Sequence, residues 1–165
     1  MSLSIRLTVY GLGRDVTLDD ARVTLLDLLR ERLALPGTRK GCDRGQCGAC
    51  MVLIDGRRIN AGLTLAVTLD GAEVTMIEGL ARSDLLHPVL TAFIEHEGFQ
   101  CGYCTPGQIM SAVDLIAEGQ AGTDPERIRE GMSGNLCRCS ACHSITEAVL
   151  DASRRIAAEN ITKSA

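Results

Sequence analysis

The 165 residues of this chain suffice for one domain or two small ones, and a formal net charge of −4 excludes the basic surface that nucleic-acid binding needs. With two Phe, two Tyr and no Trp, the chain lacks aromatic platforms for stacking bases, so its core must be aliphatic. Residues 1–10 carry neither a basic leader nor a long apolar run, which favours a cytoplasmic protein without a membrane anchor.

The eight cysteines argue against a disulfide framework, because a reducing compartment keeps thiols free. Seven of them fall in groups with the spacing of metal sites, and only Cys142 is left over. Two chemistries fit such groups. One is structural zinc, and the other is a [2Fe-2S] cluster that carries one electron.

The N-terminal part is predicted to fold as strands crossed by one helix. Alternating apolar residues indicate strands, and leucines at helical spacing behind Thr24 indicate the helix, with Asp27 completing a weak capping box. The expected elements are a hairpin over 5–18, a helix over 25–33, a second hairpin over 51–60 and a last strand over 73–77. Together they predict a β-grasp, plant-type ferredoxin domain over residues 1–78.

A glycine-rich loop between the helix and the second hairpin carries three cysteines. Cys42, Cys47 and Cys50 have the Cys-x4-Cys-x2-Cys spacing of plant-type ferredoxins, in which a more distant cysteine is the fourth ligand. The glycines let backbone N–H groups approach sulfur closely, as a cluster requires. This loop therefore favours a [2Fe-2S] cluster over zinc.

Beyond residue 78 the pattern becomes helical, with a domain boundary at 79–84. Helices are expected over 88–97, from Pro106 to about residue 119, over 125–132 and after Cys142, with a frayed tail within 151–165. Thr105 is expected to be an N-cap and Pro106 the first helical position behind it. These helices predict an all-α four-helix domain over residues 79–165, so that the whole chain is α+β.

Two cysteine pairs lie beside these helices. Cys101 and Cys104 precede the second helix, and Cys137 and Cys139 precede the last one. Four thiolates can therefore converge from helix ends on one metal centre, where the positive end of a helix dipole lowers thiol pKa values. Spacing alone leaves zinc and a [2Fe-2S] cluster equally open for these four cysteines.

Five motifs of the chain resemble a known family in both order and spacing. They are residues 41–42, 47–50, 63–66, 100–107 and 134–139. Together they closely resemble the small iron-sulfur subunit of molybdenum hydroxylases, the xanthine oxidase and carbon monoxide dehydrogenase family. The resemblance favours [2Fe-2S] clusters over zinc at both sites.

This resemblance implies a non-catalytic electron-transfer subunit of a molybdenum-dependent oxidoreductase. Electrons would pass from a molybdopterin-binding large subunit, through a proximal and then a distal [2Fe-2S] cluster, to an FAD-binding medium subunit. The complex would be a dimer of heterotrimers. The alternative is a free-standing two-cluster ferredoxin that serves several enzymes.

The resemblance also implies roles for single residues. Cys101, Cys104, Cys137 and Cys139 match the ligands of the proximal cluster, and Cys139 would lie on the electron path towards the pterin. Gln100 matches a residue that touches the pterin. No residue of this chain would take part in making or breaking substrate bonds.

One departure from the family concerns the first cluster. The fourth distal ligand of the family is a cysteine at the position of Gly62, and glycine has no side chain that could bind iron. Either an outside ligand or a neighbouring side chain completes the iron, or the cluster is labile or absent, or the sequence carries a change from its natural parent. We expect a cluster built on Cys42, Cys47 and Cys50.

A second departure follows Cys139. Read alone, Cys139-Ser-Ala-Cys142-His143 is a c-type haem attachment motif. Haem attachment would take Cys139 from the proximal cluster, so we favour the cluster. Cys142 is then expected to be a small buried residue in the first helical turn.

Overall fold

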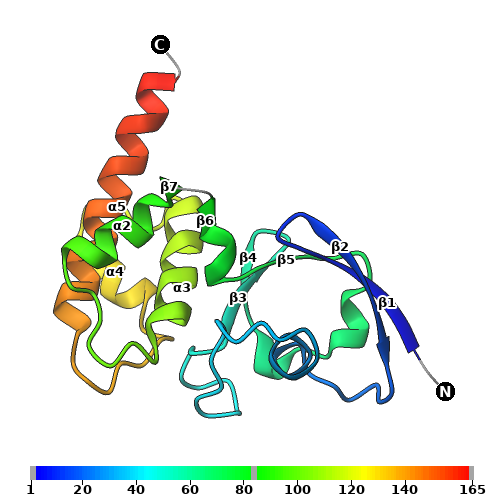
Figure 1. The fold of residues 1–165 in the computed structure, drawn as a ribbon. Helices are drawn as coiled ribbons and strands as arrows, with labels where there is room; N and C mark the ends of the chain where they lie inside the picture. The colour runs from blue at the N-terminus through cyan, green and yellow to red at the C-terminus, as the bar shows by residue number, and fades with distance from the viewer. Residues whose placement is uncertain (1–2, 83–84, 164–165) are drawn as a thin grey trace.

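The computed structural model describes residues 3–82 and 85–163, and it has a sheet-rich half and a helical half (Figure 1). The sheet contains β1 (Leu3–Val9), β2 (Leu12–Leu18), β3 (Met51–Ile54), β4 (Arg57–Asn60) and β5 (Glu73–Thr75). Their order is β2-β1-β5-β3-β4, with β1 and β5 parallel and the other pairs antiparallel. The β-grasp prediction is confirmed.

One short helix crosses this sheet, as the leucine spacing predicts. α1 (Leu25–Asp27) continues as a wider π-helical turn, η1 (Leu28–Arg32), and the Thr24 side chain accepts a hydrogen bond of 3.1 Å from the Asp27 amide. The buried leucines of this segment and the inward-facing strand residues form the first hydrophobic core. The cap holds the start of the helix and orients its apolar face towards the sheet.

The predicted strand over 73–77 is too long. β5 ends at Thr75, and the amide of Gly79 bonds to the carbonyl of Met76 at 2.9 Å in the 3-10 turn η4 (Ile77–Leu80). Two further 3-10 turns, η2 (Ala61–Leu63) and η3 (Ala66–Leu69), lie between β4 and β5. Gly62 therefore lies in the middle of the 3-10 turn η2.

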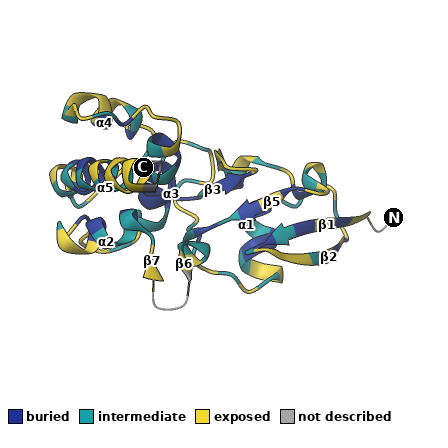
Figure 2. Cartoon of the chain, turned by 90° about the horizontal axis from the view of Figure 1, so that it is seen from above, coloured by how far each residue is buried: buried dark blue, intermediate teal, exposed yellow. Residues whose placement is uncertain are grey.

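The helical half contains the four expected helices. They are α2 (Pro88–Glu95), α3 (Thr105–Ala117), α4 (Pro125–Gly131) and α5 (Cys142–Lys163). The small hairpin of β6 (Ala81–Arg82) and β7 (Leu85–Leu86) occupies the predicted boundary, of which residues 83 and 84 lie outside the described part. The helices enclose a second core of their own, seen as the dark inner faces in Figure 2.

Two helix ends differ from expectation. Thr105 is the first residue of α3 rather than its cap, because Cys104 is the N-cap and its carbonyl accepts the Gln108 amide at 3.0 Å. The predicted frayed tail is helical as far as Lys163, and residues 164 and 165 lie outside the described part. α5 extends beyond the other helices in Figure 1. None of the helices in the described ranges is long and apolar enough to span a membrane.

The two halves meet where α3 packs on β3 and β4. At the start of α3, a Cβ on Gly107 would lie only 2.1 Å from the carbonyl oxygen of Gly48. Only glycine permits so close an approach of helix and loop. The packing therefore brings the cysteine loop of the sheet half against the cysteine motif that begins α3.

Candidate metal centres

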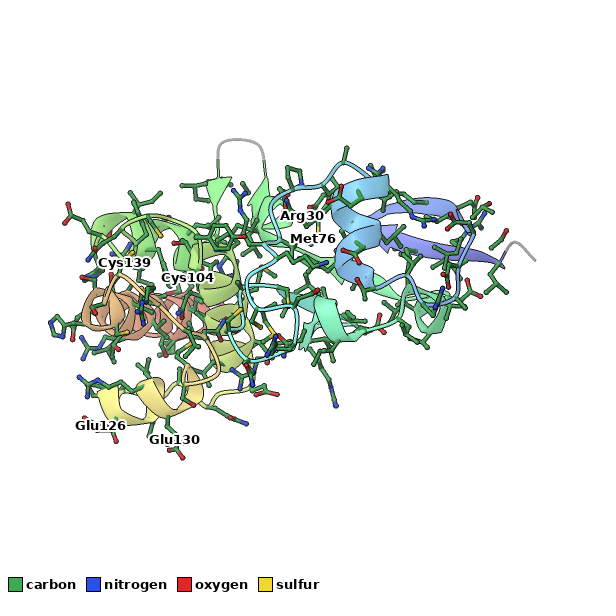
Figure 3. The ribbon with its side chains drawn as sticks, turned by 90° about the horizontal axis from the view of Figure 1, so that it is seen from below. Arg30, Met76, Cys104, Glu126, Glu130 and Cys139 are labelled. Atoms are coloured by element: carbon green, nitrogen blue, oxygen red, sulfur yellow. The ribbon has the colours of Figure 1, made fainter. Side chains whose placement is uncertain are left out.

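Four predicted ligands line one cavity of about 670 Å³ in the helical half. They are Cys101, Cys104, Cys137 and Cys139. Figure 3 shows Cys104 and Cys139 within this half. Nowhere in residues 3–82 or 85–163 do three His, Cys, Asp or Glu side chains gather as a site for one metal ion.

The four thiols pair across the two loops that carry them. The Cys101 pKa is lowered by the Tyr103 backbone N–H and then by a hydrogen bond from the Cys139 thiol. Burial raises the Cys104 pKa to about 12, and its thiol also donates to Cys137. Each loop therefore faces the other across the cavity, and a group bound there would draw donors from both.

The helix that follows the first pair turns its positive end towards this cavity, which opposes the burial that raises the Cys104 pKa. Cys104 is the N-cap of α3, so the first free N–H groups of a thirteen-residue helix lie directly behind its backbone. Four thiolates carry negative charge, which a helix N-terminus stabilises. The donor set and its surroundings thus fit a [2Fe-2S] cluster.

Two polar residues beside these cysteines are exposed. Gln100 and Arg138 are exposed beside Cys101 and Cys139. The expectation that Cys142 is buried is wrong, because it is exposed and lines the same cavity. It is the first residue of α5, and Ala141 before it takes the buried position in the core.

The first cysteine loop surrounds its sulfurs with backbone donors. The Gln46 amide lies 3.2 Å from Cys42 Sγ, and the Arg44 backbone N–H is the main reason why the Cys42 pKa falls to about 6. Cys50 is buried, which raises its pKa, although the Gly62 backbone N–H donates to its sulfur. These N–H groups would hold thiolate ligands of iron.

Hydrogen bonds join the two cysteine loops directly. The Leu136 amide donates to the Cys47 carbonyl at 2.9 Å, next to Cys137. The Asn135 side chain donates to the Gly48 carbonyl at 3.1 Å. Cys47 also lines the cavity of the second centre. The two candidate centres are therefore neighbours within one hydrogen-bonded unit.

Sequence reasoning assigned no role to two residues of this contact. The Asn135 amide spans the gap between the loops, and the Tyr103 hydroxyl donates to the Lys40 carbonyl at 2.7 Å. Both residues lie inside cysteine motifs. A polar side chain next to a proposed ligand is the sequence feature that could have identified them. Their partners could not be read from the sequence because those partners lie in the other half of the chain.

Comparisons with known proteins agree for both halves of the chain. Residues 7–79 match the family described as a 2Fe-2S iron-sulfur cluster binding domain, and residues 76–150 match the [2Fe-2S] binding domain family. The aldehyde oxidoreductase iron-sulfur-binding subunit PaoA of Escherichia coli O157:H7 is 57% identical over 91% of this chain and 72% of that relative.

A second relative and a solved structure have nearly the same length as this chain. The nicotine 6-hydroxylase small subunit of Paenarthrobacter nicotinovorans is 42% identical over 96% of this chain and 94% of that subunit. A chain of the quinoline 2-oxidoreductase crystal structure from Pseudomonas putida 86 superposes with a TM-score of 0.83 and 38% identity. It covers 93% of this chain, and 97% of that chain is matched.

Proposed function

Because the chain belongs to the small iron-sulfur subunits of the molybdenum hydroxylase family, we propose that it links a molybdopterin-binding large subunit to an FAD-binding medium subunit. The chain is a non-catalytic electron-transfer subunit of an oxidoreductase with two [2Fe-2S] domains, and its relatives belong to assemblies with further subunits. We also propose that these partners hold molybdopterin and FAD, and that the assembly is a dimer of heterotrimers.

Two ligand sets are proposed. The proximal cluster is held by Cys101, Cys104, Cys137 and Cys139, which line one cavity. The distal cluster is held by three thiolates of the loop at residues 42–50. When bound, a [2Fe-2S] cluster accepts and releases a single electron.

The observation that carries the proposal is the contact between the two cysteine loops. The carbonyl of Cys47 and the amide of Leu136 share a hydrogen bond of 2.9 Å, and each belongs to or adjoins a proposed ligand. Gly107 lets the start of α3 approach the Gly48 carbonyl so closely that a Cβ there would lie 2.1 Å from its oxygen, and the Asn135 side chain joins the two loops at 3.1 Å. The chain's role is to fix two redox sites side by side.

The exposed residues beside the helical centre fit a docked partner. Gln100 and Arg138 are exposed next to proposed ligands, and Phe99, Tyr103 and Leu136 expose between 41% and 58% of their surface there. Apolar side chains gathered around a redox site mark a surface that a partner covers. We assign this face to the large subunit, with Gln100 towards its pterin and Cys139 on the electron path.

Domain division, compartment and substrate class are further parts of the proposal. A division of the chain into residues 1–78 and 79–165 agrees with its two separate hydrophobic cores. A reducing compartment such as the cytoplasm is favoured by eight free cysteines. An aldehyde is the first substrate class to test, because the relative of 57% identity is named for an aldehyde oxidoreductase.

The proposed function is tested on the complex purified under anaerobic conditions from its native host. We expect the chain to elute with two larger chains rather than near its own 17.6 kDa. Addition of an aldehyde should bleach the visible iron-sulfur absorbance, because electrons from the substrate enter the clusters. A chain that elutes alone and is reduced only by added reductases would support the free ferredoxin instead.

A further inference from the structure

We propose that the iron centre of the first loop is bound by only three thiolates of this chain, and that its fourth coordination position, which faces Gly62, takes a small exogenous thiolate or hydroxide. The inference rests on the proposed function, because it presumes a cluster on Cys42, Cys47 and Cys50. It adds an open ligand site, which makes this centre chemically different from the one in the helical half.

The position of Gly62 beside the loop is the first observation. A Cβ built on it would lie 3.5 Å from Cys50 Sγ and 3.5 Å from Leu26 Cδ2. Both are ordinary van der Waals distances, so a side chain at this position would fit and would project beside a ligand sulfur. The missing side chain leaves that space next to the iron site.

The backbone gives no reason for glycine at this position. Gly62 lies in the 3-10 turn η2, and its φ is outside the left-handed region, unlike those of Gly45 and Gly48. At Gly45, by contrast, φ is +75° and a Cβ would lie 2.3 Å from the Leu63 side chain. The loop therefore requires glycine at position 45 but not at position 62.

No other cysteine of the chain can supply the fourth thiolate. Of the remaining five cysteines, four form the proposed set of the helical centre, and Cys142 is exposed at the start of α5. The side chain of Asn60 lies beside this site, where its Nδ2 donates to the Gly45 carbonyl at 3.4 Å, and its Oδ1 accepts from Cys50 at 3.6 Å only while that thiol carries a proton. An uncharged amide is also a poorer ligand for ferric iron than an anionic sulfur or oxygen.

Small molecules can reach this position. Gly62 and Cys42 are half-buried rather than buried, and the neighbouring Leu63 is 61% exposed. Iron with three thiolate ligands and one free position binds small anionic donors, and thiolate and hydroxide share the charge and single donor atom that the site requires.

The test uses the complete chain in its complex, with 2-mercaptoethanol as the probe and the helical centre as an internal reference. Electron paramagnetic resonance of the reduced protein should show the first-centre signal moving saturably to new g-values as the thiol is added, while the second signal stays unchanged. A first-centre signal that thiol does not move would overturn the proposal.

Three variants identify the ligand. Gly62→Cys should remove the response to thiol and slow the loss of iron to a chelator at least tenfold, because the fourth thiolate becomes part of the chain. Gly62→Ala, which adds a Cβ without a donor, should respond to thiol as the wild type does. Asn60→Ala should also leave the first signal in place, and loss of that signal would make Asn60 the ligand and overturn the proposal.

Iron content separates the remaining outcomes. About four irons per chain are expected in the wild type, two for each cluster. About two irons per chain with only the second signal would overturn the proposal, whether or not Gly62→Cys restores the rest. The helical centre gives its own signal, so such a result would still agree with the proposed electron-transfer function. Absence of both signals would contradict that function.

Discussion

Arg58 on β4 and Asp114 on α3 form an ion pair of 3.1 Å between the sheet half and the helical half. Asp114 is only 3% exposed, and Arg58 also donates to the Gly131 carbonyl at 2.9 Å. A single arginine therefore ties β4 to α3 and to the end of α4. The pair holds the surfaces whose packing places the two cysteine loops in contact.

Replacement of Arg58 should destabilise the folded chain more than neutralisation of Asp114. Arg58→Met leaves a buried charge without a partner, which costs on the order of 3 kcal/mol. For a chain of this size the loss corresponds to a Tm lower by about 6 to 12 °C. Asp114→Asn is the matched variant, and calorimetry should find its Tm loss clearly smaller. Equal losses would show that the charge itself is unimportant.

The same pair makes a prediction about pH. Burial raises the Asp114 pKa, and the Arg58 charge only partly offsets it. The folded chain therefore keeps a proton that the unfolded chain has already lost, and this contribution to stability falls as pH rises between the two pKa values. In Arg58→Met the pKa rises further. Its Tm deficit relative to the wild type should be largest at about pH 7 and smaller at about pH 4. A deficit independent of pH would contradict the charge-based account.

Gly107→Ala should push the two cysteine loops apart. The added Cβ would meet the Gly48 carbonyl at 2.1 Å, and neither backbone can move without disturbing a proposed ligand. The magnetic coupling between the two reduced centres should weaken and Tm should fall, although alanine favours helix by about 1 kcal/mol. Gly134→Ala is the control, because nothing lies within 4 Å of its Cβ. The interpretation fails if both variants retain wild-type coupling.

Cys104→Ser should remove the second centre and Cys142→Ser should not. Both cysteines line the same cavity, but Cys142 is exposed at the start of α5 and belongs to neither proposed ligand set. Iron analysis should give about two irons fewer for Cys104→Ser and no change for Cys142→Ser. Loss of iron in the second variant would make Cys142 a ligand and force a revision of the set.

Local patterns predicted most of the fold and the candidate ligands. The cysteine spacings, the leucine stripe behind Thr24 and the proline-initiated helices depend on near neighbours in the chain, and the structure contains the corresponding elements. The start of α3 at Thr105 was missed because a cysteine N-cap has no sequence signature. The sequence therefore identifies the loops but not every helix end.

Contacts between the halves could not be predicted in this way. Arg58 and Asp114 form an ion pair, but the sequence around each residue gives no indication of its partner. The bond from the Leu136 amide to the Cys47 carbonyl uses backbone groups that every residue possesses. Such pairs follow from the docking of two folded halves. Electron transfer depends on the proximity of the two centres, and that proximity is therefore visible only in the structure.

The central claim is that this chain holds two [2Fe-2S] clusters close together. Its most direct test is quantitative electron paramagnetic resonance of the fully reduced chain in its complex, with the signals integrated against the protein concentration. The account predicts about two unpaired spins per chain, in two distinguishable signals that broaden each other at low temperature. A colourless protein that contains zinc and gives no iron-sulfur signal would contradict it.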